Sequence, residues 1–194
     1  MKLMTFGELN SSQKKEAIEL FLIGFGHFMT FSKDEEKKKK LFIEIFDPSL
    51  FICYIEDDKV LGLMGLGNNK TRPINFKKEI CQKYFGKFKG FIIHKQMNSI
   101  FQKKVVSLDS ELYLDTLVTH PAERNKGIGT TLIDAATSFG DYKTIVVEVF
   151  SKNLTAIKFY EKNGFIVKKK HKGSLMSLFG SGYPITMVKS KEKQ

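Results

Sequence analysis

The chain of 194 residues has no tryptophan, only two cysteines and four prolines, and no long apolar run. A membrane-spanning helix needs about 20 mostly apolar residues, whereas the most apolar candidate, residues 20–31, is shorter and is interrupted by two glycines and a histidine. The two cysteines, Cys53 and Cys81, lie far apart in the sequence, and we expect them to be reduced thiols rather than a disulfide. We therefore expect no membrane partner and a cytoplasmic protein.

Acidic residues are few relative to basic ones, 21 against 32, which gives a net charge of +11 at pH 7. Much of the excess lies in short runs at residues 37–40, 168–172 and after Val188. A solvated lysine-rich surface accounts for such runs, and attraction of an anionic partner is the alternative. No aromatic-and-basic motif of an RNA-binding module is present, so we expect no nucleic-acid partner. The four histidines show no metal-ligand spacing, so we also expect no metal.

A glycine-rich turn is the most informative feature that the sequence does contain. Residues 124–129 read Arg-Asn-Lys-Gly-Ile-Gly, between the β-prone run 111–118 and apolar residues at helical spacing. Backbone N–H groups at the start of a helix lack partners, and the helix dipole attracts anions there. Gly127 and Gly129 carry no Cβ, so a diphosphate can approach the main chain. Because Leu132 stands where a Rossmann fingerprint has its third glycine and no P-loop lysine follows, the turn predicts another kind of pyrophosphate-bearing cofactor.

The turn is part of a longer pattern. Its members follow one another in this order: Leu117-Val118-x-x-Pro121, Arg124-x-x-Gly127-x-Gly129, Asn153, Ala156, Phe159-Tyr160 and Asn163-Gly164-Phe165. With this order and spacing, the segment from about Glu111 to Val167 resembles the acetyl-CoA-binding half of a GNAT-superfamily N-acetyltransferase. The N-terminal half resembles the family only in the general order of its elements. The resemblance implies acetyl-CoA as the co-substrate.

The resemblance also implies a fold: a mixed α/β domain over residues 1–194, with a central, mostly antiparallel sheet, a splayed parallel strand pair and flanking helices. The residue patterns predict helices at 14–25, from 32 or 34 to 45, at 127–139 and at 153–162, and strands at 50–56, 60–66, 111–118, 144–150, 164–169 and 184–188. Ser11 or Ser12 is expected to cap the first helix.

The segment from residue 68 to residue 109 reads as mostly helical. Its apolar residues are predicted near one helical face: Ile80, Tyr84, Phe88, Phe91 and Ile92. Because many related proteins join their third and fourth strands directly, we expect a helical insertion at about 70–105 between these strands. We expect it near the acceptor site, with a dimer surface as the alternative. The sequence does not decide between a monomer and a homodimer.

The resemblance assigns most cofactor contacts to the main chain. Backbone groups of Leu117, Val118 and Thr119 would line the pantetheine arm and the acyl group between the splayed strands, and the Val118 N–H would donate to the thioester oxygen. Further cofactor contacts are expected from the turn and the helices that follow it: Arg124, Asn125, Lys126, Gly127, Ile128, Gly129, Thr130, Asn153, Ala156, Phe159 and Tyr160. Asn153 is equally suited to capping the helix that it precedes.

Two side chains are candidates for proton transfer. Tyr160 occupies the position where the family often places the tyrosine that protonates the CoA sulfur, and a core tyrosine is the alternative. Asp115 is the candidate general base, and contact with the backbone or an ion pair with a lysine is the alternative. Phe28 and Phe31 are candidates for the acceptor pocket because they lie in the connection that often walls it. Ordinary core packing is the alternative for both rings.

The resemblance implies direct transfer of an acetyl group from acetyl-CoA, and a primary amine of a small molecule is the expected acceptor. Acetylation of a protein N-terminus or lysine is an alternative, but it needs an open groove that a helical insertion would obstruct. A non-catalytic CoA-binding module is a third hypothesis. A basic nucleic-acid binder is a fourth, and it predicts affinity for generic DNA or RNA that falls steeply with salt.

Overall fold

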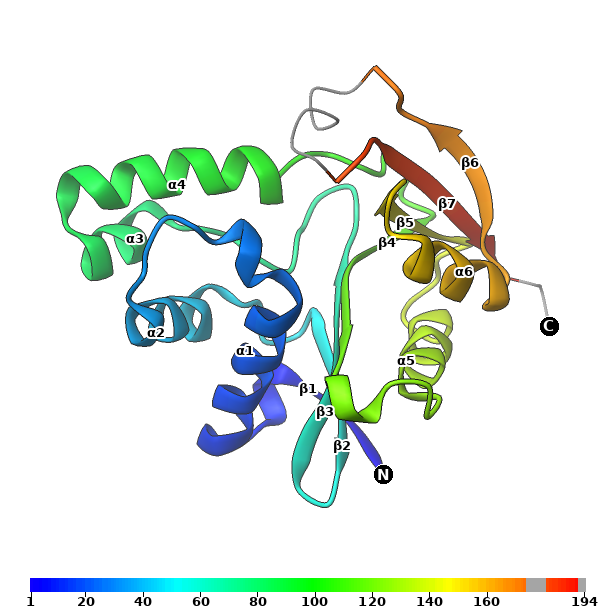
Figure 1. The fold of residues 1–194 in the computed structure, drawn as a ribbon, viewed down its shortest axis with the longest axis horizontal. Helices are drawn as coiled ribbons and strands as arrows, with labels where there is room; N and C mark the ends of the chain where they lie inside the picture. The colour runs from blue at the N-terminus through cyan, green and yellow to red at the C-terminus, as the bar shows by residue number, and fades with distance from the viewer. Residues whose placement is uncertain (174–180, 192–194) are drawn as a thin grey trace.

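The computed structural model describes residues 1–173 and 181–191, and its mixed α/β fold is built on one seven-stranded sheet (Figure 1). The strands are β1 Lys2–Thr5, β2 Phe51–Glu56, β3 Lys59–Gly67, β4 Glu111–Thr119, β5 Thr144–Phe150, β6 Ile166–Lys170 and β7 Pro184–Ser190. The helices are α1 Ser11–Phe25, α2 Glu35–Ile45, α3 Lys78–Phe85, α4 Lys87–Phe101, α5 Ile128–Thr137 and α6 Leu154–Lys162. Over the described ranges, no helix has the length and apolar character required to cross a membrane.

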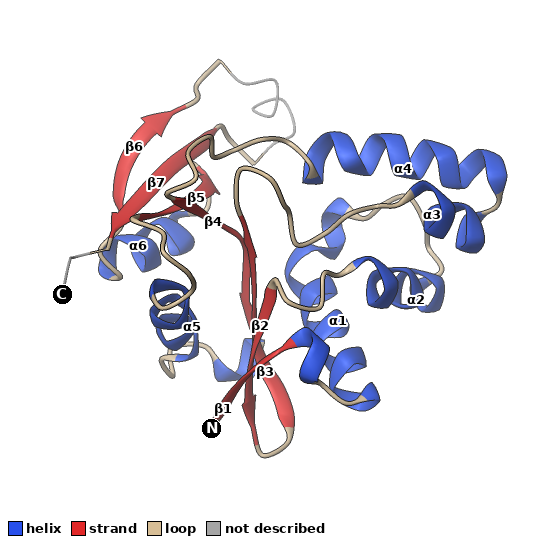
Figure 2. Ribbon diagram, turned by 180° about the vertical axis from the view of Figure 1, so that it is seen from behind, coloured by secondary structure: helices blue, strands red, loops and turns tan. Residues whose placement is uncertain are grey.

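The strand order is β1-β2-β3-β4-β5-β7-β6, and within the described residues every neighbouring pair is antiparallel except β4 with β5. Helices cover both faces of this sheet, with α1 to α4 on one face and α5 and α6 on the other (Figures 1 and 2). The expected fold class, including the single parallel pair, is therefore confirmed.

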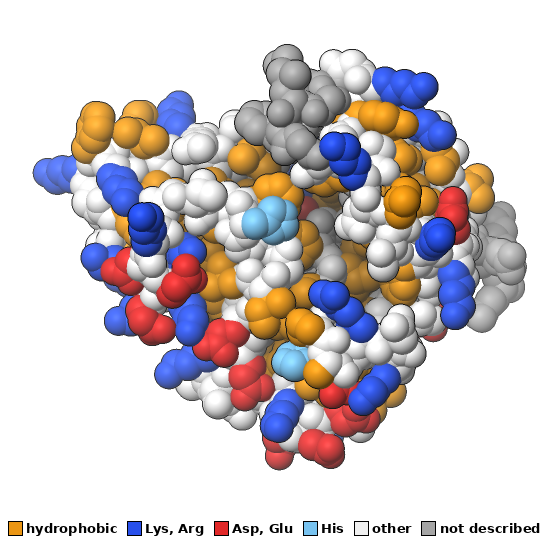
Figure 3. Space-filling view, viewed as in Figure 1, with side chains coloured by type: hydrophobic (Ala, Val, Ile, Leu, Met, Phe, Trp, Pro, Cys, Tyr) orange, Lys and Arg blue, Asp and Glu red, His pale blue; other side chains and the backbone are white. Residues whose placement is uncertain are grey.

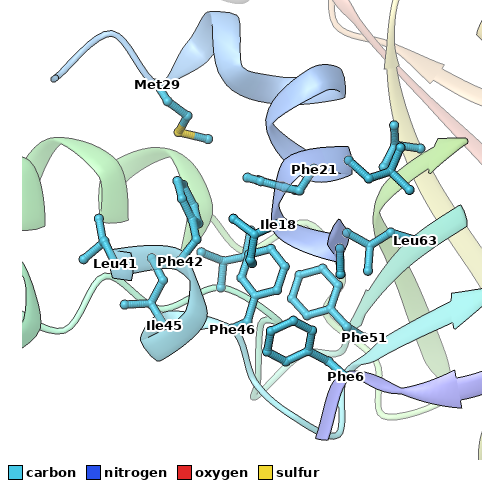
Figure 4. Close-up of a cluster of buried hydrophobic side chains, with 14 of the residues drawn as sticks. Phe6, Ile18, Phe21, Met29, Leu41, Phe42, Ile45, Phe46, Phe51 and Leu63 are labelled. Carbon is cyan, nitrogen blue, oxygen red and sulfur yellow. The ribbon is translucent and has the colours of Figure 1, made fainter. Parts of the chain in front are cut away.

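Phenylalanine fills the core between the sheet and the first four helices (Figure 4). Phe46 stacks on Phe51 of β2 with ring centroids 3.9 Å apart, and Phe21 of α1 meets Phe42 of α2 at 5.0 Å in a tilted arrangement. Offset and tilted ring pairs add to the stabilisation that burial of the rings provides. These contacts hold α1 and α2 against the sheet in a chain that contains no tryptophan.

The predicted ends of α6 are confirmed. The Asn153 side chain accepts a hydrogen bond from the Ala156 N–H at 3.1 Å, which caps the first turn. At the other end, Gly164 has a φ of 82°, and the Phe165 N–H donates to the Tyr160 carbonyl at 3.0 Å. This is the Schellman arrangement, in which a left-handed glycine closes the helix.

The N-terminal segment differs from the prediction in two respects. Residues Lys2–Thr5 form the edge strand β1, which no pattern indicated because four residues are too few to show an alternation. The cap of α1 is Asn10 rather than Ser11 or Ser12. Its side chain accepts from the Gln13 N–H at 2.9 Å, and the Gln13 side chain accepts from the Asn10 N–H at 3.2 Å, which forms a capping box.

The helical insertion between β3 and β4 is confirmed, but only as α3 and α4, because residues 68–77 form a loop. The predicted apolar face of the insertion is confirmed in α3, where Ile80 and Tyr84 pack against the core. It is wrong in α4, where Phe88 is 80% exposed and the buried residues are instead Ile93, Met97 and Phe101. Gly90 explains the difference. A Cβ at this position would lie 2.5 Å from the Cα of Gln82, so α4 crosses α3 at its glycine and turns the face of Phe88 outward.

Candidate active site

The strands β4 and β5 part after a short paired stretch. Their pairing ends at Leu114 opposite Val147, although β4 continues to Thr119 and β5 to Phe150. On their outer sides β4 stays paired with β3, and β5 stays paired with β7. Beyond the paired stretch, the inner edges of the two strands face each other without ladder hydrogen bonds. A row of main-chain groups at such an edge can pair with a bound molecule.

The amides of Leu117 and Thr119 face this parting. The His120 N–H donates to the Leu61 carbonyl of β3 at 2.8 Å, and the amides of an antiparallel strand alternate between its two edges. The Val118 N–H therefore points toward β3. The sequence analysis expected the Val118 N–H to donate to the thioester oxygen, but in this register it points to β3, and the N–H groups of Leu117 and Thr119 face the parting.

A left-handed turn leads from β4 into α5. Asn125 has a φ of 64° and Gly127 a φ of 86°, and the helix begins at Ile128. The Thr131 N–H donates to the Gly127 carbonyl at 2.9 Å, which is the first hydrogen bond of the helix. The N–H groups from Ile128 to Thr130 precede it and have no carbonyl partner within the helix. A Cβ at Gly127 would have nothing within 4 Å, so an anion can approach these amides from open space.

The two cationic side chains of the turn differ in whether an acidic residue neutralises them. Lys126 pairs with Glu123 at 2.7 Å, so this cation is shared with a carboxylate three residues earlier. Arg124 is exposed and has no acidic partner among the described residues. Of the two cations predicted beside the cofactor, Arg124 is therefore the one with its charge available.

Gly129 serves helix packing. Its Cα lies against α6, where an added Cβ would be 2.8 Å from the Cζ atom of Phe159. The side chains of Ile128 and Phe159 also pack in the core between α5, α6 and the sheet. The sequence assigned Gly129 to the approach of a diphosphate, and the structure gives it a second reason, because only glycine lets the two helices meet here.

Asp115 lies at a bulge in β4. Consecutive residues of β3 pair with Leu114 and Thr116, so Asp115 is the extra residue between them. Its carboxylate binds Arg72 at 2.9 Å and 3.2 Å, and only 7% of the Asp115 side chain and 9% of the Arg72 side chain are exposed. Burial raises the pKa of Asp115, and the Arg72 guanidinium, which also lies over the Tyr113 ring, counteracts this rise. Asp115 thus forms an ion pair, which the sequence analysis gave as the alternative to a general base, and its partner is an arginine instead of the expected lysine.

Glu148 is a second carboxylate that the sequence reasoning missed. It is the first residue of β5 beyond the stretch paired with β4. Its side chain is 18% exposed and lies 3.9 Å from Lys103 Nζ and 3.9 Å from His171 Nε2. Burial is the main cause that raises the pKa of both Tyr113 and Asp115, and the charge of Glu148 adds to the rise in each case. Glu148 is therefore a carboxylate at the parting whose two basic neighbours lie too far away for a direct hydrogen bond.

Tyr160 lies on the other side of the sheet, in α6. Its ring packs against Phe159 and Phe165, with centroids 5.4 Å and 5.3 Å away. Burial raises the pKa of Tyr160, so its phenol stays protonated. Its hydroxyl has no hydrogen-bond partner among the described residues. The phenol is therefore a free, protonated donor as well as a member of the core.

The two aromatic candidates for the acceptor pocket lie apart. Phe28 is 37% exposed and its ring centroid lies 6.3 Å from that of Phe150, the last residue of β5. Phe31 packs edge-on against Phe76 and Phe85 in the core under α3. Phe28 thus lies near the end of the parted strand, whereas Phe31 has the ordinary packing role.

In the space-filling view, the surface is hollowed between the side of the molecule formed by α1 to α4 and the side formed by α5 and α6, and apolar side chains gather on its walls (Figure 3). A family model described as the acetyltransferase (GNAT) family matches residues 20–165. The chain belongs to the GNAT acetyltransferase family.

Solved structures show the GNAT fold at low sequence identity. An N-acetyltransferase from Staphylococcus aureus Mu50 has a TM-score of 0.64 at 15% identity, over 97% of this chain and 100% of that one. Aminoglycoside 6′-acetyltransferase type Ii has a TM-score of 0.62 at 14% identity, over 100% and 99%. A Bacillus anthracis str. Ames acetyltransferase, in complex with acetyl coenzyme A, has a TM-score of 0.51 at 16% identity, over 73% and 62%. A comparison with curated proteins finds no match.

In this GNAT chain only the short 3-10 helix Pro121–Glu123 separates the exposed amides of β4 from the turn at 124–130. The Asn153 side-chain oxygen accepts from the Ala156 N–H, so the side-chain amide nitrogen of Asn153 can donate to another group. Ala156 is half-buried on the same helix turn. Among the described residues, no group of three His, Cys, Asp or Glu side chains is placed to hold a metal ion.

Proposed function

We propose that this GNAT chain transfers an acetyl group from acetyl-CoA to a primary amine of a small molecule. The observation that carries the proposal is the first turn of α5, where Gly127 holds a left-handed conformation and open space adjoins the amides that follow. Free amides at a helix start bind phosphate oxygens, and the helix dipole adds to the attraction. The exposed Arg124 contributes a further cation. These features fit the diphosphate of CoA.

The parted strands suit the remainder of the co-substrate. Main-chain groups of β4 can pair with the amide-bearing pantetheine arm as a strand would, since β5 has turned away. Bound acetyl-CoA supplies an acetyl group already activated as a thioester. The N–H groups of Leu117 and Thr119 face the parting and are available to polarise its carbonyl oxygen.

Proton transfer then falls to two side chains on opposite sides of the parting. The amine must lose a proton to attack the carbonyl carbon. Glu148 can accept this proton, because Lys103 and His171 lie 3.9 Å away and neither makes a direct hydrogen bond to its carboxylate. As the carbon–sulfur bond breaks, the protonated phenol of Tyr160 can donate to the departing thiolate. Asp115, with both oxygens held by Arg72, fixes the bulge and is not free to accept the proton.

The insertion supports a small acceptor. Residue 103, two positions after the end of α4, brings its Nζ within 3.9 Å of Glu148. The space beside the carboxylate is thereby limited on this side, whereas a peptide acceptor needs a groove that continues past the reacting amine.

Free-thiol release from acetyl-CoA in the presence of single amines, amino acids and short peptides tests the proposal. We expect turnover with at least one small amine and mass-spectrometric detection of its N-acetyl product. Replacement of Glu148 by Gln should lower kcat more at neutral pH than at alkaline pH, where the amine is already deprotonated. Turnover with peptides alone would contradict the small-molecule acceptor. Absence of acetyl-CoA binding to the folded protein would contradict the enzyme itself.

A further inference from the structure

A basic cavity adjoins Glu148. It has a volume of about 300 Å³ and lies between Lys103, just after α4, and residues 170–173 with Pro184. Its described lining residues are Lys103, Lys170, His171, Lys172, Gly173 and Pro184. Four of these residues are basic and none is acidic. The basic run 168–172, which the sequence left between a solvated surface and an anion-attracting one, thus contributes to a concave site.

Two lining residues connect the cavity to the carboxylate. Lys103 Nζ and His171 Nε2 lie 3.9 Å from opposite oxygens of Glu148. At this distance neither nitrogen makes a direct hydrogen bond to the carboxylate. His171 bonds instead to Thr186 Oγ1 at 2.8 Å. Lys103 therefore keeps its ammonium donors for another acceptor while it remains beside Glu148.

The charges around the site do not balance. Arg72 and Asp115 neutralise each other in a buried pair, so Glu148 is left as the carboxylate that faces Lys103 and His171. Lys170, farther along the cavity wall, adds positive charge. A polycationic amine would meet this charge with repulsion. An amine that brings its own negative group would place its nitrogen at Glu148 and that group at Lys103.

The geometry points to an acceptor amine that itself carries an anionic group, a carboxylate or a phosphate, close to its nitrogen. This inference rests on the proposed acetyl transfer at the parting of β4 and β5. The spacing agrees, because Glu148 and Lys103 are 3.9 Å apart, so one small acceptor can contact both side chains. The cavity is also large enough for a phosphate or a carboxylate with its hydration.

Matched acceptor pairs test this inference. Ethanolamine is compared with O-phosphoethanolamine, and glycinamide with glycine, so that each pair differs in the anionic group and the two pairs distinguish phosphate from carboxylate. We expect the anionic member of at least one pair to have a kcat/KM higher by about tenfold or more. Spermidine, a polycation, should be a poor acceptor.

Lys103→Gln and Lys104→Gln form a matched pair of variants. Both residues are exposed and both changes remove one positive charge, but only Lys103 lines the cavity. Lys103→Gln should raise KM for the anionic acceptor about tenfold and should raise KM for the uncharged acceptor much less. Lys104→Gln should leave both unchanged. Equal use of charged and uncharged acceptors, preference for spermidine, or equal effects of the two variants would overturn the inference.

Binding provides a readout that does not need turnover. In calorimetry with CoA present, O-phosphoethanolamine or glycine should bind saturably to the wild-type protein and to Lys104→Gln, and more weakly to Lys103→Gln. Absence of binding of both ligands to a protein that does bind CoA would overturn the inference and leave the proposed function standing. Failure to bind CoA itself would remove the proposed function, and the two failures are thus separate.

Discussion

Replacement of Arg72 by methionine tests whether one buried cation ties the insertion to the candidate site. Arg72 lies in the loop before α3 and binds both oxygens of Asp115 at 2.9 Å and 3.2 Å. Its guanidinium also lies 4.7 Å from the centroid of the Tyr113 ring and donates to the Lys103 carbonyl. Methionine keeps a side chain of similar length but leaves the Asp115 carboxylate buried without its cation.

The expected cost is large. Loss of one partner of a buried ion pair destabilises a protein by about 3–5 kcal/mol, against a total stability of about 5–15 kcal/mol for a typical domain. Burial raises the pKa of Asp115 and Arg72 opposes the rise, so the variant should have a still higher pKa. Because the folded state then holds a proton that the unfolded chain releases, stability is lost as the pH rises from the ordinary carboxyl pKa to the raised one.

Denaturant unfolding followed by circular dichroism measures this effect at acidic and alkaline pH. Arg72→Met should unfold at a lower denaturant concentration, and the difference from wild type should widen with increasing pH. Adding Asp115→Asn should restore part of the loss, because no buried charge is then left. Lys83→Met breaks an exposed pair with Glu44 of α2 and should leave the midpoint unchanged. An Arg72→Met midpoint equal to wild type, or a loss independent of pH, would refute the reasoning.

Three further variants test the anion site at the start of α5, the contact between α5 and α6, and the proton donor Tyr160. Gly127→Val should weaken CoA binding by more than about tenfold. Gly86→Val is the control, because Gly86 has a φ of 77° in equally open space, and it should leave CoA binding intact. Equal losses of CoA affinity in calorimetry would contradict an anion site at Gly127. Gly129→Ala should cost about 1–3 kcal/mol because its Cβ meets Phe159 at 2.8 Å; thermal unfolding should show this loss and its relief by Phe159→Leu, and no relief would refute the contact. Tyr160→Phe should lower kcat by about 100-fold. Since burial raises the pKa of Tyr160, the pH–rate profile should show no alkaline decline from its ionisation, and such a decline would contradict its role as the acid.

Much of the C-terminal half was predictable because its signals are local. The turn at 124–129, the cap Asn153 and the stop at Gly164 each depend on a few neighbouring residues, and the structure has the predicted α5 and α6 around them. The interactions that define the carboxylates are not local. Arg72 and Asp115 are 43 positions apart, and no pattern in one sequence pairs a loop arginine with a residue at a bulge.

Other differences have identifiable physical causes. Glu148 interrupts an otherwise apolar strand, Thr144–Phe150, and a charge in such a run is a signal of function or pairing that could have been weighed. The face that α4 buries depends on Gly90, whose role appears only when α3 is packed against it. The alternation of amides along β4 likewise required the hydrogen-bond register with β3, which no composition or spacing reveals.

The central claim is that main-chain amides at the start of α5 hold the diphosphate of CoA. An NMR titration of the ¹⁵N-labelled protein tests it most directly, with CoA as one ligand and pantetheine, which lacks the diphosphate, as the other. The account predicts that the amide signals of residues 127–130 shift saturably with CoA and stay in place with pantetheine. Unshifted signals at these residues while CoA binds elsewhere, or no binding at all, would contradict it.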